Sequence, residues 1–166
     1  MANSLIDRFQ RWFDYERDAH AKVLASLETV PEERRSDPEF RRALTIFGHV
    51  VAARRAWLGR LGMAPLFKGQ LFPAEVELSQ LKDDCREVEA LWADAYAKLD
   101  DDDALDRVVE YQSFDGNRFR NTVEEILTQL FGHSWYHRGQ IAMLVRASGG
   151  QPAMTDLIYW CREPLT

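Results

Sequence analysis

Apolar residues recur at intervals of three and four positions in four stretches of the chain, a period typical of amphipathic helices. These stretches cover residues 4–28, 36–61, 74–99 and 122–149. Ser36 followed by Glu39 has the S-x-x-E form of a capping box and predicts the start of the second helix. Four long amphipathic helices in a chain of this size predict an all-α fold, a four-helix bundle that forms one domain over residues 1–166.

The segments between the helices carry their own signals. Residues 62–73 contain two glycines and two prolines among apolar residues, which predicts a long connection packed against the bundle at the edge of a site. The acidic run from Asp100 to Asp103 predicts a solvated helix end. In VVEYQSFDGNRF, a turn at Asp115-Gly116-Asn117 lies between β-branched and aromatic residues, which predicts a small hairpin before the last long helix.

Composition and charge narrow the function classes. The 166 residues carry a net charge of -6, and the basic residues are scattered in pairs such as Arg34-Arg35 and Arg54-Arg55. Nucleic acid is therefore not an expected partner, because phosphate binding needs a concentrated basic face. A membrane is not expected either, because no apolar run approaches the roughly 20 residues that a bilayer requires. With no CxxC pair and no signal pattern, we expect a cytoplasmic protein.

Histidines supply the candidate chemistry. His133 and His137 are four residues apart on the last predicted helix, so both imidazoles project from one face and can meet one metal ion. Many such pairs are ordinary packed or surface residues. These two lie on the apolar face between Leu130 and Ile141, where a neutral imidazole needs a buried partner. His49 lies on the inward stripe of the second helix, and a bundle can bring it opposite the pair. Three nitrogen ligands leave a coordination position open for water or substrate.

Three other classes of site do not fit. A zinc protease needs a glutamate directly after the first histidine of HExxH, and this chain has Ser134 there. A ferritin-like di-iron bundle needs inward carboxylates in ExxH pairs, which the two histidine-bearing helices lack. A hydrolase with a nucleophile elbow needs GxSxG, which the sequence does not contain.

Three segments, GHVVAARRAWLGRLG, FGHSWYHRGQIAMLVRASGGQP and TDLIYW, resemble the DinB/YfiT-like family of four-helix-bundle metalloenzymes. The match covers most of the chain in order, and HxxxHRGQI is its most specific part. The resemblance implies that His49, His133 and His137 bind one divalent metal ion, nickel or zinc first, with iron, manganese or cobalt also compatible. It also implies a homodimer and a small-molecule substrate, with relatives that act as metal-dependent transferases of low-molecular-weight thiols, isomerases or hydrolases.

Two functions follow from these observations. One is a metal-dependent thiol S-transferase or a related hydrolase. The alternative is a non-catalytic, metal-stabilised module that binds a small molecule or acts in a stress response. An adjoining open cavity favours the enzyme, whereas a fourth protein ligand such as Cys161 or His20 favours a structural site.

Five further residues are candidates near the site. His20 lies on the inward face of the first helix, where we favour a satisfied core or cleft histidine over a metal or substrate role. Trp57 is either a wall of the site or a core residue. Tyr111 and Asp156 are candidate acceptors for the second N–H group of a ligating imidazole. Arg138 belongs to the family signature and is expected to hold a carboxylate or to cap the packing.

The two residues after Arg138 in the signature receive structural interpretations. For Gly139 we expect close contact between helices, and for Gln140 a role in packing.

Overall fold

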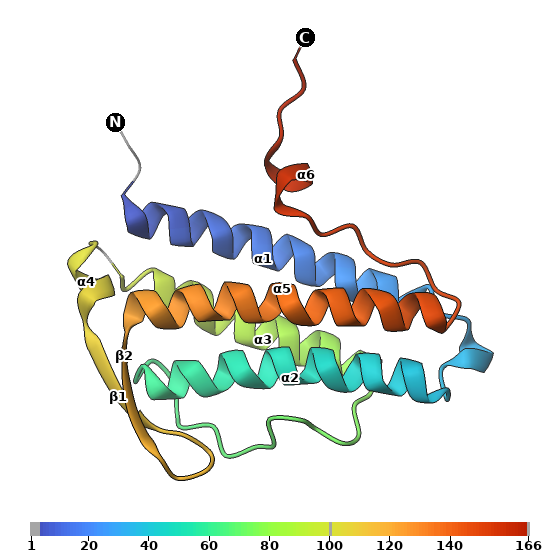
Figure 1. Ribbon diagram of the computed structural model, residues 1–166, viewed down its shortest axis with the longest axis horizontal. Coiled ribbons are helices and arrows are strands. Elements are labelled where there is room, and N and C mark those ends of the chain that lie inside the picture. Colours follow the sequence, from blue (N-terminus) through green and yellow to red (C-terminus); the bar gives the residue numbers. More distant parts are fainter. Residues whose placement is uncertain (1–3, 100, 166) are drawn as a thin grey trace.

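A computed structural model describes residues 4–99 and 101–165 and contains a bundle of four long helices (Figure 1). These helices are α1 (Leu5–Glu28), α2 (Pro38–Arg60), α3 (Leu78–Tyr96) and α5 (Val123–Ala147). Helix α2 packs against α3 and α5, and α1 packs against the same two helices. The predicted all-α four-helix bundle is confirmed. None of the helices described is both long and apolar enough to cross a bilayer.

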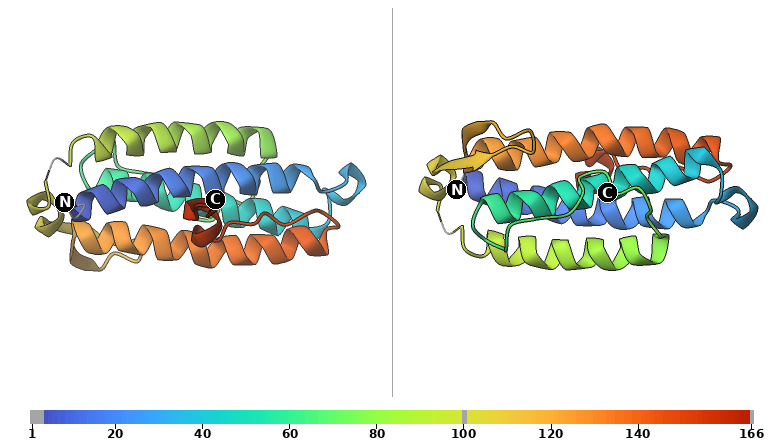
Figure 2. Two further views of the ribbon diagram at one scale, coloured as in Figure 1. Left: turned by 90° about the horizontal axis from the view of Figure 1, so that it is seen from above. Right: turned by 90° about the horizontal axis from the view of Figure 1, so that it is seen from below.

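Shorter elements join the long helices. They are the 3₁₀ turn η1 (Glu32–Arg34), α4 (Asp103–Asp106), β1 (Val108–Gln112), β2 (Arg118–Thr122) and α6 (Leu157–Cys161). The connection after α2 runs the length of the bundle before α3 begins, so α2 and α3 point in the same direction, opposite to α1 and α5 (Figures 1 and 2). The chain after α5 returns along the bundle, and α6 projects away from it (Figure 1).

The helix starts show which sequence signals were decisive. Ser4 and Asp7 form a capping box at α1, and Thr122 and Glu125 form one at α5. The box predicted at Ser36 is wrong, because the N-cap of α2 is Asp37 and Pro38 is its first residue. A proline disfavours helical backbone in the residue before it and is itself favoured at the first helical position, so it overrides the S-x-x-E pattern.

Helix α3 is shorter than the predicted 74–99, because it begins at Leu78 and ends at Tyr96. The chain before it stays irregular while it closes against α2 near Gly48, where a Cβ atom would lie 3.3 Å from Cγ2 of Val76. The acidic run after it also differs from the prediction of a merely solvated end. The carboxylate of Asp102 accepts hydrogen bonds from the backbone N–H groups of Leu5 (3.1 Å) and Ile6 (2.9 Å), at the start of α1. Asp100 lies outside the described residues.

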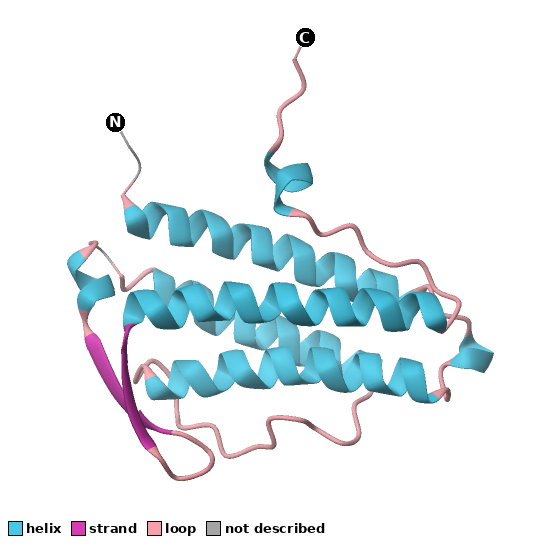
Figure 3. Cartoon of the chain, in the orientation of Figure 1, coloured by secondary structure: helices cyan, strands magenta, loops and turns pink. Residues whose placement is uncertain are grey.

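The hairpin predicted before the last helix is present (Figure 3). Strands β1 and β2 pair antiparallel, with Val108 opposite Thr122 and Gln112 opposite Arg118. Gly116 takes a positive φ of 87° in the turn, a conformation that glycine adopts without steric cost. Because Thr122 also caps α5, the hairpin is fixed directly to the helix that carries two of the candidate ligands.

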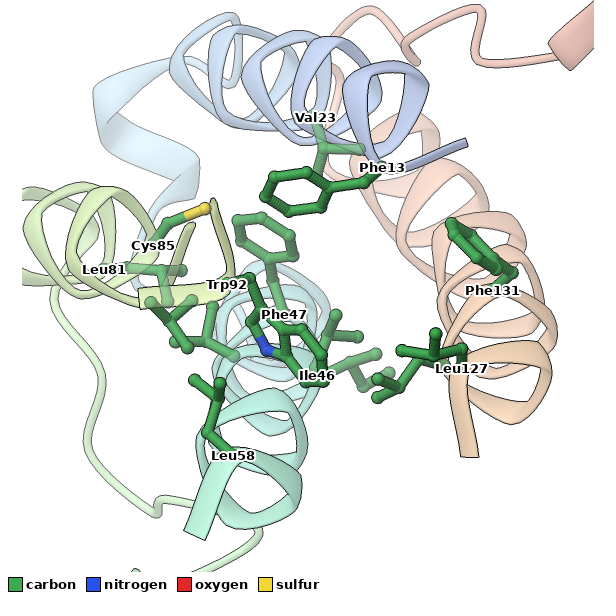
Figure 4. Close-up of a cluster of buried hydrophobic side chains, with 14 of the residues drawn as sticks. Phe13, Val23, Ile46, Phe47, Leu58, Leu81, Cys85, Trp92, Leu127 and Phe131 are labelled. Atoms are coloured by element: carbon green, nitrogen blue, oxygen red, sulfur yellow. The ribbon is translucent and has the colours of Figure 1, made fainter. Parts of the chain in front are cut away.

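The core fills the space between the four helices with aromatic and aliphatic side chains (Figure 4). Phe13 of α1, Phe47 of α2, Trp92 of α3 and Leu127 of α5 are all buried there. Burying one large apolar side chain is worth about 1.5–3 kcal/mol, so this core is what holds the helices in register. Trp92 also donates its indole N–H to the backbone oxygen of Arg54 at 3.2 Å.

Candidate metal centre

The three histidines singled out in the sequence meet between α2 and α5. Nε2 of His133 lies 3.0 Å from Nε2 of His49 and 3.2 Å from Nε2 of His137. His49 and His137 are buried and His133 is half-buried. Their ligand atoms all lie within 4.8 Å of one another, a group that could hold a metal ion.

In two of the three imidazoles, those of His49 and His137, Nδ1 makes a hydrogen bond to an oxygen acceptor. These bonds fix the proton of each ring on Nδ1. Nδ1 of His49 donates to the backbone oxygen of Leu71 at 2.8 Å, and Nδ1 of His137 donates to Oε1 of Gln140 at 2.7 Å. A neutral imidazole with a proton on Nδ1 has its lone pair on Nε2. Both lone pairs therefore point at the same place, next to Nε2 of His133.

A divalent cation fits this arrangement better than hydrogen bonds between the rings do. If His133 carries a proton on Nε2, it can donate to only one of its two neighbours. Three nitrogens held at about 2.0–2.1 Å from one tetrahedral zinc ion are separated by about 3.3 Å, close to the two separations observed here. Burial and the neighbouring histidines lower the pKa of His133 to about 4, so the ring is neutral at pH 7, as a ligand must be.

The connection after α2 closes over His49. A Cβ atom at Gly48 would lie 2.9 Å from Cγ of Pro73, so only glycine lets the connection approach this closely. The approach places the Leu71 oxygen on the imidazole and stacks Phe72 on the same ring, with centroids 3.8 Å apart and planes 4° apart. Burial accordingly lowers the pKa of His49.

A cavity of about 380 Å³ adjoins the cluster and reaches His49 and His133. Its walls come from α2, the connection after α2, the hairpin and α5, so a molecule inside it would lie against the histidine cluster. The residues that line it are His49, Ala53, Ala56, Trp57, Arg60, Leu71, Tyr111, Ser113, Phe114, Phe119, Gln129, Leu130 and His133.

A buried ionic network fixes the two histidine-bearing helices to α1. Glu16, which is fully buried, accepts hydrogen bonds from Arg54 of α2 and Arg138 of α5. Arg138 also donates to the hydroxyl of Tyr15 at 2.6 Å, and Arg54 donates to Oγ of Ser134 at 3.3 Å. Burial is the largest influence on Glu16 and by itself would raise its pKa, but Arg54, His20 and Arg138 together outweigh it and hold this pKa below its usual range.

The remaining candidate residues lie in two different cavities. Trp57 and Tyr111 line the cavity beside the cluster, with the Tyr111 hydroxyl donating to Asn121 at 2.8 Å. Asp156 lines a second cavity, together with Tyr15. Neither Tyr111 nor Asp156 is the acceptor observed for a histidine of the cluster, because Leu71 and Gln140 provide those acceptors.

Gly139 and Gln140 do not have the structural roles that the sequence predicted for them. Gly139 is exposed, and among the described atoms no contact lies within 4 Å of where its Cβ would be, so close helix packing does not require it. Gln140 instead binds the His137 ring, a role that its position three residues further along the same helix could have indicated. Arg138 holds a carboxylate, that of Glu16, as expected.

His20 lies outside the cluster. Its Nδ1 is 3.1 Å from Oε1 of Glu89, and its Nε2 is 3.7 Å from Oε2 of Glu16. Cys161 lies in α6 with its thiol 3.8 Å from the backbone oxygen of Ile158. Among the residues that the structure describes, the three histidines are therefore not joined by a fourth histidine, cysteine or carboxylate ligand.

Fold and cluster together define a helical-bundle protein with a three-histidine group that could hold a divalent metal ion. The chain belongs to the DinB family, whose family model matches residues 1–163. It is similar to protein DinB of Bacillus subtilis (strain 168), with 24% identity over 155 residues, 87% of this chain and 88% of that protein. No solved structure gives a significant match.

Proposed function

We propose that His49, His133 and His137 bind one divalent metal ion, nickel or zinc, and that the protein is a metal-dependent thiol S-transferase or a related hydrolase. The observation that carries this proposal is the convergence of three Nε2 atoms at the wall of a cavity of about 380 Å³. A divalent ion held by three neutral imidazoles lowers the pKa of a thiol or water in its open position and so supplies a nucleophile near neutral pH.

The residues of the chain would position both the ligands and the substrate. Leu71 and Gln140 hold two imidazoles in the tautomer that metal binding needs. Phe72 covers one side of His49 and excludes water from it. Trp57 and Tyr111, whose ring centroids lie 4.9 Å apart, offer an apolar wall on which an organic substrate can pack.

In the transferase reaction, the sulfur of a small thiol forms a bond to an electrophilic carbon. The leaving group departs from that carbon with the bonding electron pair, and the thiol proton passes to buffer. No oxidant or reductant is consumed. In the hydrolase version, water replaces the thiol and the same proton balance holds.

The alternative is the non-catalytic module, in which the metal stabilises the bundle and the cavity only binds. It shares the metal site and differs in reactivity. Support for the enzyme comes from the cavity that reaches His49 and His133, since a purely structural zinc site is closed by four protein ligands.

Metal content tests the site first. Protein purified without a metal-affinity tag is loaded with zinc or nickel, and its metal is counted by plasma mass spectrometry. We expect about one ion per chain for the parent and much less for His49→Ala and His137→Ala. His20→Gln is the matched histidine control and should keep the parent's metal content. A parent that takes up neither ion would overturn the proposal.

Reactivity then separates the two functions. The loaded protein is incubated with a panel of low-molecular-weight thiols and an activated aryl chloride, and formation of the thioether is followed. Metal-dependent acceleration that His137→Ala abolishes supports the transferase. Full metal binding without acceleration in this assay or in an ester hydrolysis panel favours the non-catalytic module.

A further inference from the structure

Arg60, in the last turn of α2, packs against three aromatic rings beside the candidate metal centre. Its guanidinium carbon lies 4.7 Å from the ring centroid of Trp57, 4.9 Å from that of Tyr111 and 5.1 Å from that of Phe114. All four residues line the cavity that reaches His49 and His133. Rings on the face of a guanidinium leave its N–H edges available and reduce its freedom to move.

The charge of Arg60 has no counterion among the described residues. Its hydrogen-bond acceptor there is the backbone oxygen of Gln112, at 3.5 Å. None of the described residues that line the cavity is acidic, and its two histidines are neutral when they bind a metal. Arg60 is half-buried, and this burial lowers the pKa of its guanidinium.

Two other arginines of α2 show what a structural role looks like in this helix. Arg54 pairs with Glu16 inside the bundle, and Arg55 pairs with Glu87 at 3.0 Å on the surface. Arg60 is half-buried like Arg55, but it differs from both because it has no acidic partner in the described part of the chain. Half burial of a cation without a counterion costs free energy that an anionic ligand can recover.

We propose that this cavity binds a small molecule with a carboxylate or similar planar anionic group, and that Arg60 holds that group while the opposite end of the molecule reaches the three histidines. The proposal rests on the proposed function and deepens it by naming the substrate class. The helical rise separates His49 from Arg60 by about 16 Å along α2, so the ligand must be extended to reach both ends. The aromatic rings would contact its middle.

Cobalt-substituted protein provides a direct test, because a thiolate bound to cobalt gives a charge-transfer absorption band. We would titrate ω-mercaptooctanoate and ω-mercaptooctanol, which have equal chain lengths and differ in the terminal charge. Mercaptoacetate, too short to span the cavity, is the length control. We expect ω-mercaptooctanoate to bind about tenfold more tightly than ω-mercaptooctanol. Mercaptoacetate carries the same carboxylate but is too short to reach Arg60 from the metal, so it should not show this tighter binding.

Variants assign the preference to one residue. Arg60→Gln should remove it, Arg60→Lys should keep part of it, and Arg55→Gln, the matched α2 control, should leave it intact. The melting temperature of each variant shows whether the fold retains the parent's stability. The comparison of octanoate with alcohol on the parent needs no variant and stays valid if Arg60→Gln is unstable.

A metal-free measurement separates this proposal from the metal site. In ¹⁵N-labelled, metal-free protein, ω-mercaptooctanoate should shift the Nε–H resonance of Arg60 in a saturable way. ω-Mercaptooctanol should not shift it. Equal cobalt-band affinities for the two long thiols would overturn the anion site and leave the metal site standing. A shifted Arg60 resonance with no cobalt band from any thiol would support the anion site and overturn thiolate binding at the metal. Absence of both signals would overturn both.

Discussion

Oε1 of Gln140 lies 2.7 Å from Nδ1 of His137 and accepts a hydrogen bond from it, so this one contact decides which nitrogen of the ring is free to bind a metal. The two residues are separated by one helical turn of α5. A rigid helix therefore supplies both the candidate ligand and the group that orients it.

Substituting Gln140 tests this contact. Gln140→Leu should weaken metal affinity about 10- to 100-fold, because the ring loses the acceptor that fixes its tautomer and orientation. Gln140→Glu keeps an acceptor and should bind at least as tightly as the parent. Competition with a chromogenic chelator measures both, and equal affinities for the parent and Gln140→Leu would contradict the role of this side chain.

Glu16 holds two buried guanidinium groups, of Arg54 and Arg138, so its removal should be costly. We expect Glu16→Gln to lower the free energy of unfolding at pH 7 by about 3–5 kcal/mol, because both cations lose their charge partner inside the bundle. Urea denaturation measures the change. Glu87→Gln, which breaks the exposed pair with Arg55, is the control and should change stability by less than about 1 kcal/mol.

The same carboxyl predicts a pH dependence. The pKa of Glu16 is held below its ordinary 4.5 in the folded protein, so its stabilising effect is complete above about pH 4.5 and is lost as the pH falls through the lower folded pKa. The stability difference between the parent and Glu16→Gln should therefore shrink on acidification below pH 4.5. A difference that stays constant down to acid denaturation would contradict this assignment.

Gly48 and Gly132 form a matched pair in two helices. Gly132→Ala adds a methyl group where no described atom lies within 4 Å, so it should raise stability by about 0.5–1 kcal/mol. Gly48→Ala places its methyl group 2.9 Å from Cγ of Pro73 and should displace the connection that carries Leu71. We expect weaker metal binding for Gly48→Ala and unchanged binding for Gly132→Ala, both measured by chelator competition.

The two cysteines should differ in reactivity. Burial, reinforced by Glu89, raises the pKa of the Cys85 thiol, and the residue is only 2% exposed. Cys161 is half-buried in α6. Iodoacetamide at pH 8 should therefore modify Cys161 in the native protein and Cys85 only after unfolding, as peptide mass spectrometry would show. Rapid modification of native Cys85 would indicate that α3 opens locally.

The local signals in the sequence were sufficient for the helices and for the histidine pair. Apolar periodicity predicted the four long helices, and the spacing of His133 and His137 placed both rings on one face of α5. Both depend on contacts within a single turn of one helix, which the order of residues determines. The boundary at Pro38 failed because two local signals competed, and the steric restriction by proline was the stronger.

Only the tertiary structure determined which hydrogen-bond and charge partners come from distant parts of the chain. The acceptor for His49 is a backbone oxygen at Leu71, and backbone carbonyls are the same in every residue, so no pattern in the sequence could mark it. Likewise, Asp102 caps α1, and Arg60 faces the cavity with no counterion among the described residues, only because the folded bundle brings those segments together. Periodicity determines which face of a helix is apolar, but the packing of side chains between helices determines which atoms meet across that face.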